Sequence, residues 1–452
     1  MTEIPESFSL AEALQAADQT RCLEIGAGVI GAAPRVFRQQ FGQRPAIIVA
    51  DLNTFPAAGQ AVAEAFRAAG HPMLEPFLFR VPDLHAEHSH VEELESVLRP
   101  HSAIAVAVGS GTINDMTKLA SHRLERPYLC VATAASMDGY TAYGASITFE
   151  GSKQTFFCPA PAAVVADLDV IRAAPGLMNS WGYADLLAKV PAGADWMLAD
   201  ALGLDPIDRR AWAMVQSRLR DFVADPAGIR DRSPATTSRL IEGLMLGGFA
   251  MQASKSTRVA SGAEHLFSHL WDMQHHTHNG AAPSHGFKVG IGTLASTALH
   301  ERLLASPLEQ LDVEACCAAW PSLDAWLARA REWLGAGNLL GVATREFSAK
   351  YPTAAQLREQ LLRIKAHWPD LRERLRAQLL PLDALRRMLR EAGAPVDPEE
   401  IGIDRRRLRQ AFWQASLIRN RFVVLDLAVR TGSLDACMDH IFGPDGLWPI
   451  RE

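Results

Sequence analysis

The first third of the chain alternates between two kinds of segment, and this alternation constrains the fold more than any other feature. Short apolar runs rich in valine, isoleucine and alanine recur at 45–51, 103–108, 128–133 and 162–167. Such runs are typical of strands that are buried on both faces of a parallel sheet. Segments with helical periodicity lie between them, at 58–69 and 91–98. We therefore predict a doubly wound α/β sheet, followed by a β-hairpin at 146–158.

The pattern changes after about residue 172. Strand signals nearly disappear, and segments with helical periodicity dominate, as at 184–200, 235–255, 262–274, 355–379 and 405–430. The sequence therefore predicts two domains. Residues 1–172 form an α/β domain, and residues 173–452 form an all-helical domain.

Composition and charge exclude several classes of protein. The chain has 452 residues, of which 48% are hydrophobic and 21% charged, as expected of a globular protein. Its formal net charge of −6 opposes binding to nucleic acid. The arginine-rich region 363–430 is the best argument for a nucleic-acid-binding or scaffold protein. Acidic residues are interleaved there, however, so we interpret it as a solvated helical face and expect no nucleic-acid partner.

The cysteines and the first residues bear on location. Six cysteines are scattered without a CxxC pair, which predicts free thiols in a reducing compartment. The first ten residues contain acids and no basic segment followed by an apolar one, so we expect no signal peptide. No stretch approaches the roughly 18 uninterrupted apolar residues of a membrane span. These features predict a cytoplasmic protein.

A glycine-rich turn, Gly109-Ser110-Gly111, directly follows the apolar run 103–108 and precedes a helix-like stretch. A strand, a glycine turn and a helix N-terminus form an arrangement that holds phosphate groups, because glycines let backbone N–H groups approach the oxygens. The helix start adds partial positive charge. Asp115 and Lys118 lie in the first helical turns. A tight turn without a ligand is the alternative, and the strand context favours the phosphate-binding interpretation.

A second glycine motif spans residues 26–31 and matches GxGxxG after a short strand candidate at 22–25. Asp51 stands 20 residues beyond it at the end of a strand, where it can accept a hydrogen bond from a ribose hydroxyl. Both features also have an ordinary structural interpretation. The motif can be a plain turn, and Asp51 can cap a helix or turn.

Histidines cluster between residues 264 and 286. His265 and His269 are spaced to lie on one face of a helix, and His285 follows beside a turn. Imidazole is a preferred ligand of divalent metals such as zinc, so we predict that two or three of these histidines bind a metal. His275, His276 and His278 lie in a polar loop and are predicted to be solvated.

Asp185 is a candidate acidic ligand. It is placed at the start of an otherwise apolar helical segment. A buried carboxylate needs a partner, which a metal ion would supply. A position at the helix N-terminus, where the helix dipole favours an acid, is the alternative explanation.

Several of these segments together resemble the iron-containing alcohol dehydrogenase superfamily, which includes the dehydroquinate synthases. Within it they are most similar to the sn-glycerol-1-phosphate dehydrogenase family, and the stretch from Ser261 to His269 is the most specific. The region 303–380 matches least well. The similar segments are 49–55, 109–118, 131–139, 182–189, 195–196, 260–269, 285–293, 392–402 and 418–421.

The resemblance implies a Rossmann-like N-terminal domain with a parallel sheet and an all-α C-terminal domain, as in dehydroquinate synthases. It implies that Asp185, His265 and His285 are metal ligands, and that His269 is their neighbour. It places Asp138 beside the reacting hydroxyl, so that Asp138, Asp185, His265 and His285 form the catalytic set. The positions similar to those that bind the nucleotide are Asp51, Gly109, Ser110, Gly111, Asp115, Thr133 and Ser136.

The resemblance also implies a reaction, the reversible NAD(P)-linked conversion of dihydroxyacetone phosphate to sn-glycerol 1-phosphate, which belongs to phospholipid metabolism. One divalent metal would act as a Lewis acid, with zinc favoured and nickel or iron as further candidates. NADH and NADPH stay equally open, since Ser110, Ala132 and Met137 depart from the family pattern. We expect a small phosphorylated substrate and a homo-oligomer, a dimer or larger.

Three basic residues flank the ligand motifs, namely Lys189, Arg258 and Lys288. They are candidates for binding the substrate phosphate, and ordinary surface charge is the alternative. Two related activities are alternatives to the main prediction. One is a glycerol-type polyol dehydrogenase without a phosphate site. The other is a phosphate-eliminating cyclase of the dehydroquinate synthase kind, whose additional basic residues we do not find.

Overall fold

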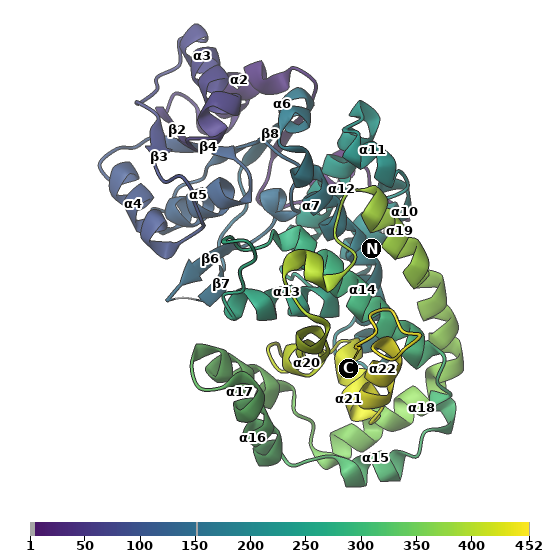
Figure 1. The fold of residues 1–452 in the computed structure, drawn as a ribbon. Coiled ribbons are helices and arrows are strands. Elements are labelled where there is room, and N and C mark those ends of the chain that lie inside the picture. The colour runs from purple at the N-terminus through teal and green to yellow at the C-terminus, as the bar shows by residue number, and fades with distance from the viewer. Residues whose placement is uncertain (1–4, 151, 452) are drawn as a thin grey trace. The chain divides into compact units, whose positions relative to one another are not determined.

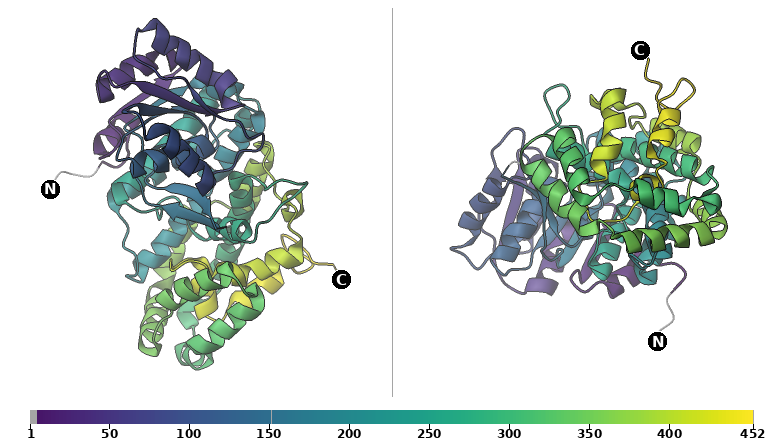
Figure 2. Two further views of the ribbon diagram at one scale, coloured as in Figure 1. Left: turned by 90° about the vertical axis from the view of Figure 1, so that its left-hand side faces the viewer. Right: turned by 90° about the horizontal axis from the view of Figure 1, so that it is seen from below.

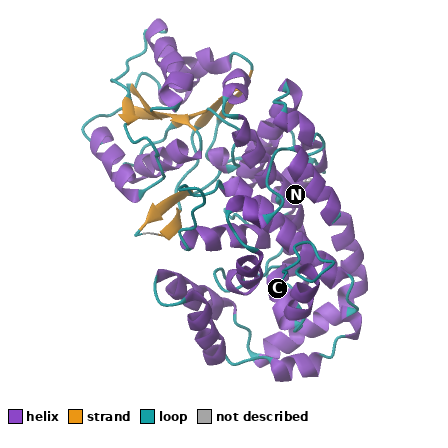
Figure 3. Cartoon of the chain, in the orientation of Figure 1, coloured by secondary structure: helices purple, strands orange, loops and turns teal. Residues whose placement is uncertain are grey.

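The computed structural model describes residues 5–150 and 152–451, which divide into two compact units. The first unit comprises the chain up to Leu186 together with Arg209–Val259. The second comprises Leu187–Asp208 together with the chain from Ala260 onward. In the described part of the chain the last strand is β8 (Ala163–Asp167), which ends close to residue 172, where strand signals disappear from the sequence. Figure 3 shows the strands in orange among the helices. The domain boundary between residues 172 and 173 stays a prediction.

A parallel sheet forms the centre of the first unit. In the described part of the chain it has six strands in the order β1-β8-β5-β4-β2-β3, all paired in parallel. The remaining strands are β1 (Cys22–Gly26), β2 (Ala46–Asp51), β3 (Phe77–Phe79), β4 (Ile104–Gly109) and β5 (Leu129–Ala132). The doubly wound α/β prediction is therefore confirmed. The sequence analysis missed β3, because a three-residue strand is too short to show a pattern.

Helices cover both faces of this sheet, as Figures 1 and 2 show. Helices α2 (Ala33–Phe41) and α3 (Gln60–Ala68) lie on one face, and α4 (His88–Leu98) and α5 (Gly111–Arg123) on the other. Phe37 of α2 and Phe66 of α3 are fully buried against strand residues such as Val106. Burial of one such side chain contributes about 2–3 kcal/mol. This layering explains why the strands are apolar on both faces.

A two-stranded antiparallel hairpin follows the fifth sheet strand in sequence. It consists of β6 (Ala145–Phe149) and β7 (Ser152–Phe156), which confirms the predicted hairpin. The other helices that lie wholly in the first unit are α1 (Leu10–Ala16), α6 (Leu168–Ala173), α9 (Arg209–Gln216), α10 (Leu219–Phe222), α11 (Pro226–Arg230) and α12 (Pro234–Ser254). Helix α7 (Gly176–Leu187) carries Asp185 and ends one residue into the second unit.

The second unit is built of helices. They are α8 (Lys189–Ala201), α13 (Ala263–Met273), α14 (His285–Leu304), α15 (Val313–Ala319), α16 (Leu323–Leu334), α17 (Asn338–Lys350), α18 (Ala354–Gln378), α19 (Leu382–Glu391), α20 (Arg405–Ala415), α21 (Val424–Arg430) and α22 (Leu434–Ile441). The least family-like region, 303–380, shares an aromatic core with α20, and the rings of Trp326 and Trp413 lie 5.9 Å apart there.

Two predicted helical segments are divided in the structure. The segment 184–200 is divided at Ala188, between α7 and α8. Pro191 explains this division, because its ring is incompatible with an acceptor at Leu187 and it has no N–H. The segment 405–430 is divided into α20 and α21, and the amide of Val423 donates to Asp426 at 3.0 Å at the start of the second helix.

Two features of the structure concern possible contact with a membrane or with nucleic acid. Within residues 5–150 and 152–451, no helix has both the length and the apolar character needed to cross a membrane. Several arginines of the region 363–430 pair with acids on the surface, for example Arg376 with Glu373 at 2.7 Å and Arg405 with Glu399 at 2.8 Å. These pairs support the interpretation of that region as a solvated helical face.

Candidate metal and nucleotide site

The glycine turn 109–111 has the arrangement that the sequence predicts. Strand β4 ends at Gly109, and helix α5 begins at Gly111. A Cβ on Gly109 would lie 2.5 Å from Cβ of Ile113, so the tight turn requires glycine. Ser110 precedes the helix, but its side chain does not cap the first turn. The backbone N–H groups at the start of this helix can therefore donate hydrogen bonds to an anion.

The carboxyl ends of neighbouring parallel strands lie at one edge of a sheet. Strands β2, β4 and β5 are neighbours, so Asp51, Gly109 and Thr133 lie along the same edge. The amide of Thr133 donates to the carbonyl of Gly109 at 3.2 Å, and Thr133 and Ser136 are both buried. This edge is where doubly wound folds bind nucleotides. The assignment of these side chains to a nucleotide stays a prediction.

Asp51 organises the turn after β2. Its Oδ1 accepts hydrogen bonds from the amides of Asn53 at 2.8 Å and Thr54 at 2.6 Å. Oδ1 therefore caps this turn, as the alternative interpretation of Asp51 predicts. The half-buried carboxylate still lies at the strand end, where a ribose would be bound.

The other glycine motif, residues 26–31, is a structural turn. Gly28 has a left-handed backbone with φ of 67°, which favours glycine. The amides of Gly28 and Ile30 donate to the two carboxylate oxygens of Asp167, at 3.2 and 2.8 Å. Because the Asp167 carboxylate already accepts these hydrogen bonds, the motif stabilises the fold. This agrees with the alternative interpretation of the motif as a plain turn.

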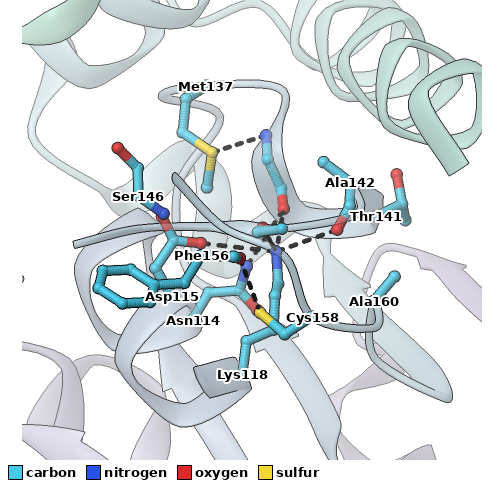
Figure 4. A network of polar contacts seen from close by, with 12 residues as sticks. Asn114, Asp115, Lys118, Met137, Thr141, Ala142, Ser146, Phe156, Cys158 and Ala160 are labelled. Carbon is cyan, nitrogen blue, oxygen red and sulfur yellow. Dashed lines mark hydrogen bonds and ion pairs between the residues drawn. The ribbon is translucent and has the colours of Figure 1, made fainter. Parts of the chain in front are cut away.

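On α5, Lys118 is buried and Asp115 is half-buried, and both contact the segment 139–146 that follows β5 (Figure 4). The Asp115 carboxylate accepts from the amide of Ser146 at 3.1 Å and lies 3.5 Å from the Lys118 ammonium. Burial raises the pKa of Asp115, and the Lys118 charge opposes that rise. In the structure Asp115 contacts Ser146 of β6, and its contact with the nucleotide stays a prediction.

Helices α13 and α14 bring two histidines together. The imidazole rings of His265 and His285 have centroids 5.3 Å apart. This approach depends on Gly292 of α14, where a Cβ would lie 2.2 Å from the carbonyl oxygen of Glu264 on α13. The ring of His269 is farther from each of the other two, at 6.2 Å.

Each of the two histidines has a polar partner at its Nδ1 nitrogen. Nδ1 of His265 lies 2.8 Å from Oε1 of Glu264, and Nδ1 of His285 lies 3.3 Å from Oγ of Ser268. Metal-binding histidines have such partners, which fix the ring and leave Nε2 for the metal. The sequence analysis did not assign these roles to Glu264 and Ser268, although both lie within the most family-like stretch.

Asp185 completes a group that could hold a metal ion. One ligand atom from each of Asp185, His265 and His285 lies within 4.8 Å of the others. Asp185 is fully buried, and its Oδ2 accepts a hydrogen bond from the amide of Asp138 at 3.1 Å. It lies in the last turn of α7, so its placement at a helix start was wrong, and the N-cap alternative is excluded. The misplacement arose because α7 begins at Gly176, before the apolar periodicity becomes clear.

The remaining candidates are also placed by the structure. Lys189, Arg258 and Lys288 are all buried, which excludes ordinary surface charge as their explanation. Lys288 forms an ion pair with Asp272. His276, predicted to be solvated, is instead buried between the Ile401 carbonyl at 2.7 Å and the Arg407 guanidinium at 2.8 Å.

Comparisons with known proteins show the fold and the family of the chain. A sequence model of the family described as iron-containing alcohol dehydrogenase matches residues 24–175, which include most of the sheet and the glycine turn 109–111. Among solved structures, a probable glycerol dehydrogenase from Sinorhizobium meliloti has a TM-score of 0.58 at 17% identity, and the alignment covers 93% of this chain and 97% of that one. This likeness shows that the chain has the fold of this enzyme class.

Curated relatives define the family more narrowly. Glycerol-1-phosphate dehydrogenase [NAD(P)+] of Halalkalibacterium halodurans is 32% identical over 294 residues, which are 65% of this chain and 73% of the relative. The protein of the same name from Bacillus velezensis is 30% identical over 316 residues, 68% of this chain and 79% of the relative. The chain therefore belongs to the glycerol-1-phosphate dehydrogenase family, which confirms the resemblance found in the sequence.

Proposed function

We propose that this protein is a metal-dependent NAD(P)-linked oxidoreductase that interconverts dihydroxyacetone phosphate and sn-glycerol 1-phosphate. In the direction of reduction, dihydroxyacetone phosphate, NAD(P)H and a proton give sn-glycerol 1-phosphate and NAD(P)⁺. The observation that carries the proposal is the convergence of Asp185, His265 and His285, three residues distant in sequence, on one point. Membership of the family supports the choice of substrate.

The three side chains fit a divalent metal. Two imidazoles and one carboxylate make a donor set typical of catalytic zinc, with a position open for substrate. The buried surroundings of Asp185 and His265 support a metal site, and the Nδ1 partners of both histidines favour Nε2 of each ring as the ligand atom. A bound ion would supply Lewis acidity to the carbonyl oxygen of the substrate. Zinc is the favoured ion, with nickel and iron as alternatives.

The residues at the sheet edge would hold the nucleotide. Backbone N–H groups at the turn Gly109-Ser110-Gly111 would bind the pyrophosphate, and Asp51 would accept from a ribose hydroxyl. Thr133 and Ser136 would line the nucleotide, and Asp115 would act through the backbone at Ser146, which it holds. NAD(P)H supplies the hydride.

Asp138 would act on the substrate side. Its amide already holds Oδ2 of Asp185, so the backbone at this position is fixed relative to a metal ligand. Fixed positioning of a group beside the reacting centre lowers the cost of reaching the transition state. We therefore assign Asp138 to contact the hydroxyl formed from the ketone.

Buried basic residues would recognise the substrate phosphate. Lys288 lies one helical turn beyond His285 on α14, and Lys189 follows Asp185 by four residues. A phosphate dianion is bound by charge-assisted hydrogen bonds from such groups, and Arg258 is a third candidate.

Replacement of Lys189, Arg258 or Lys288 is expected to lower the preference of the protein for a phosphorylated substrate. In K189M, R258M or K288M, loss of a direct contact should lower kcat/KM for dihydroxyacetone phosphate by about 10- to 100-fold, while the rate with dihydroxyacetone changes little. Steady-state kinetics with both ketones measure the ratio. If the ratio stays at the wild-type value in all three variants, the phosphate lies elsewhere.

The function itself is tested with purified protein. We expect reduction of dihydroxyacetone phosphate by NADH or NADPH, loss of this activity after treatment with a chelator, and recovery on addition of Zn²⁺, Ni²⁺ or Fe²⁺. Faster reduction of dihydroxyacetone than of its phosphate would instead indicate a neutral polyol dehydrogenase. Absence of both reactions in metal-loaded protein would refute the proposal.

Two further properties are proposed. The six cysteines are free thiols in the structure, which supports a reducing compartment, the cytoplasm. We also propose a homo-oligomer, which light scattering of the purified protein tests.

A further inference from the structure

Lys118 is a buried lysine whose contacts are almost all with one loop. Its side chain is fully inaccessible to solvent. Its Nζ donates to the carbonyl oxygens of Gly139 at 3.2 Å, Ala142 at 3.1 Å and Gly144 at 2.9 Å, as Figure 4 shows. An ammonium group has three donors and no acceptor, so three carbonyls use its full capacity. A charge in such a place is costly unless it is compensated in this way.

Neighbouring residues of α5 attach to the same loop. The side-chain amide of Asn114 donates to the Gly139 carbonyl at 3.2 Å, so this carbonyl accepts from two residues of the helix. Asn114 is itself fixed by the hydroxyl of Tyr128 at 2.9 Å. The middle of the loop has a separate attachment, because the Thr141 hydroxyl donates to the Met245 carbonyl at 2.9 Å. Loss of Lys118 would therefore alter the loop at Gly139 without detaching the loop as a whole.

The loop leads directly to a proposed metal ligand. Gly139 follows Asp138, and the Asp138 amide donates to Oδ2 of Asp185 at 3.1 Å. The amide of Gly139 also donates to Sδ of Met137, so the backbone on both sides of Asp138 is held. A small displacement of Gly139 would move the Asp138 amide, which donates to the Asp185 carboxylate.

We propose that Lys118 is a positioning residue for the metal site. It fixes the Asp138–Gly139 backbone, and this backbone orients Asp185. The inference rests on the proposed function, because it takes Asp185 as a metal ligand. Residues that orient a ligand change metal affinity about 10- to 100-fold when they are lost, and this is the effect expected here. Lys118 itself touches neither substrate nor metal.

The test uses Co²⁺ alone with metal-stripped protein, without any turnover. The variant K118M keeps the length of the side chain and removes the three donors. We expect its dissociation constant for Co²⁺, measured by competition with a chelator, to rise about 10- to 100-fold. We also expect its visible Co²⁺ absorption spectrum to differ from that of the wild type, because the spectrum reports ligand geometry.

A matched control separates positioning from general stability. Lys350 is also buried, and its ammonium pairs with Asp426 at 2.6 Å in the second unit. The variant K350M therefore removes a buried charge remote in sequence from the loop. We expect K350M to lose thermal stability but to keep the wild-type Co²⁺ affinity and spectrum. Equal weakening of Co²⁺ binding in K118M and K350M would overturn the inference, as would wild-type binding in K118M.

A milder variant covers the case in which K118M does not fold. N114A removes the other donor to the Gly139 carbonyl and keeps Lys118. We expect it to weaken Co²⁺ binding several-fold, with a spectral change in the same direction, and unchanged binding would overturn the inference. A wild-type protein that binds no Co²⁺ would instead refute the proposed function itself.

Discussion

Replacement of His265 by alanine is expected to abolish stoichiometric metal binding and to lower kcat/KM by more than about 10³-fold, while the chain stays folded. Loss of one donor that stabilises a developing oxyanion already costs about 10²–10³-fold, and here the ligand of the ion itself is removed. Elemental analysis, kinetics with dihydroxyacetone phosphate and circular dichroism measure the three quantities.

His276 provides a matched control for H265A. It is also a buried histidine of the second unit, but its ring nitrogens contact the Ile401 carbonyl and the Arg407 guanidinium. We expect H276A to lower thermal stability and to retain metal and turnover. Full activity of H265A in a metal-free preparation would contradict the assigned role of His265.

Replacement of Gly292 by alanine is expected to separate the two histidines by forcing α13 and α14 apart. The added Cβ would lie 2.2 Å from the Glu264 carbonyl oxygen and 2.9 Å from its carbonyl carbon. These are backbone atoms, so relief requires one helix to move, at a cost of about 3 kcal/mol in the free energy of unfolding. We expect a lower Tm together with weaker metal binding.

Gly341 of α17 gives the control for this substitution. No atom lies within 4 Å of a Cβ placed there. Since alanine is the better helix former, G341A should be neutral or stabilise the protein by up to about 1 kcal/mol, with unchanged metal affinity. A G292A protein that binds metal and melts like the wild type would show that the close contact of the helices does not hold the site together.

The sheet could be predicted because its signal is local. Strands such as 46–51 and 104–109 are apolar on both faces, and each is followed by a turn and a helix. The glycine turn at 109–111 could be predicted for the same reason, since strand, turn and helix are adjacent in sequence. The turn at 26–31 also fits a phosphate-binding motif. Only the structure shows that its amides donate hydrogen bonds to Asp167.

The metal-ligating group could not be derived from spacing. Spacing on a helix favours His265 with His269, whereas the structure brings His265 closer to His285. This proximity depends on the packing of two helices across Gly292, which no local pattern reports. Similarity to the family selected the ligands that the structure brings together. The sequence places Lys118 in the first turns of a helix, and its three carbonyl partners come from tertiary structure alone.

We propose that Asp185, His265 and His285 bind one divalent ion at the place where dihydroxyacetone phosphate is reduced. The most direct test is anomalous diffraction from crystals of active protein, recorded at the absorption edge of the metal found by elemental analysis. We expect one strong peak in contact with these three side chains. An active protein whose peak lies elsewhere, or that gives no peak, would contradict it.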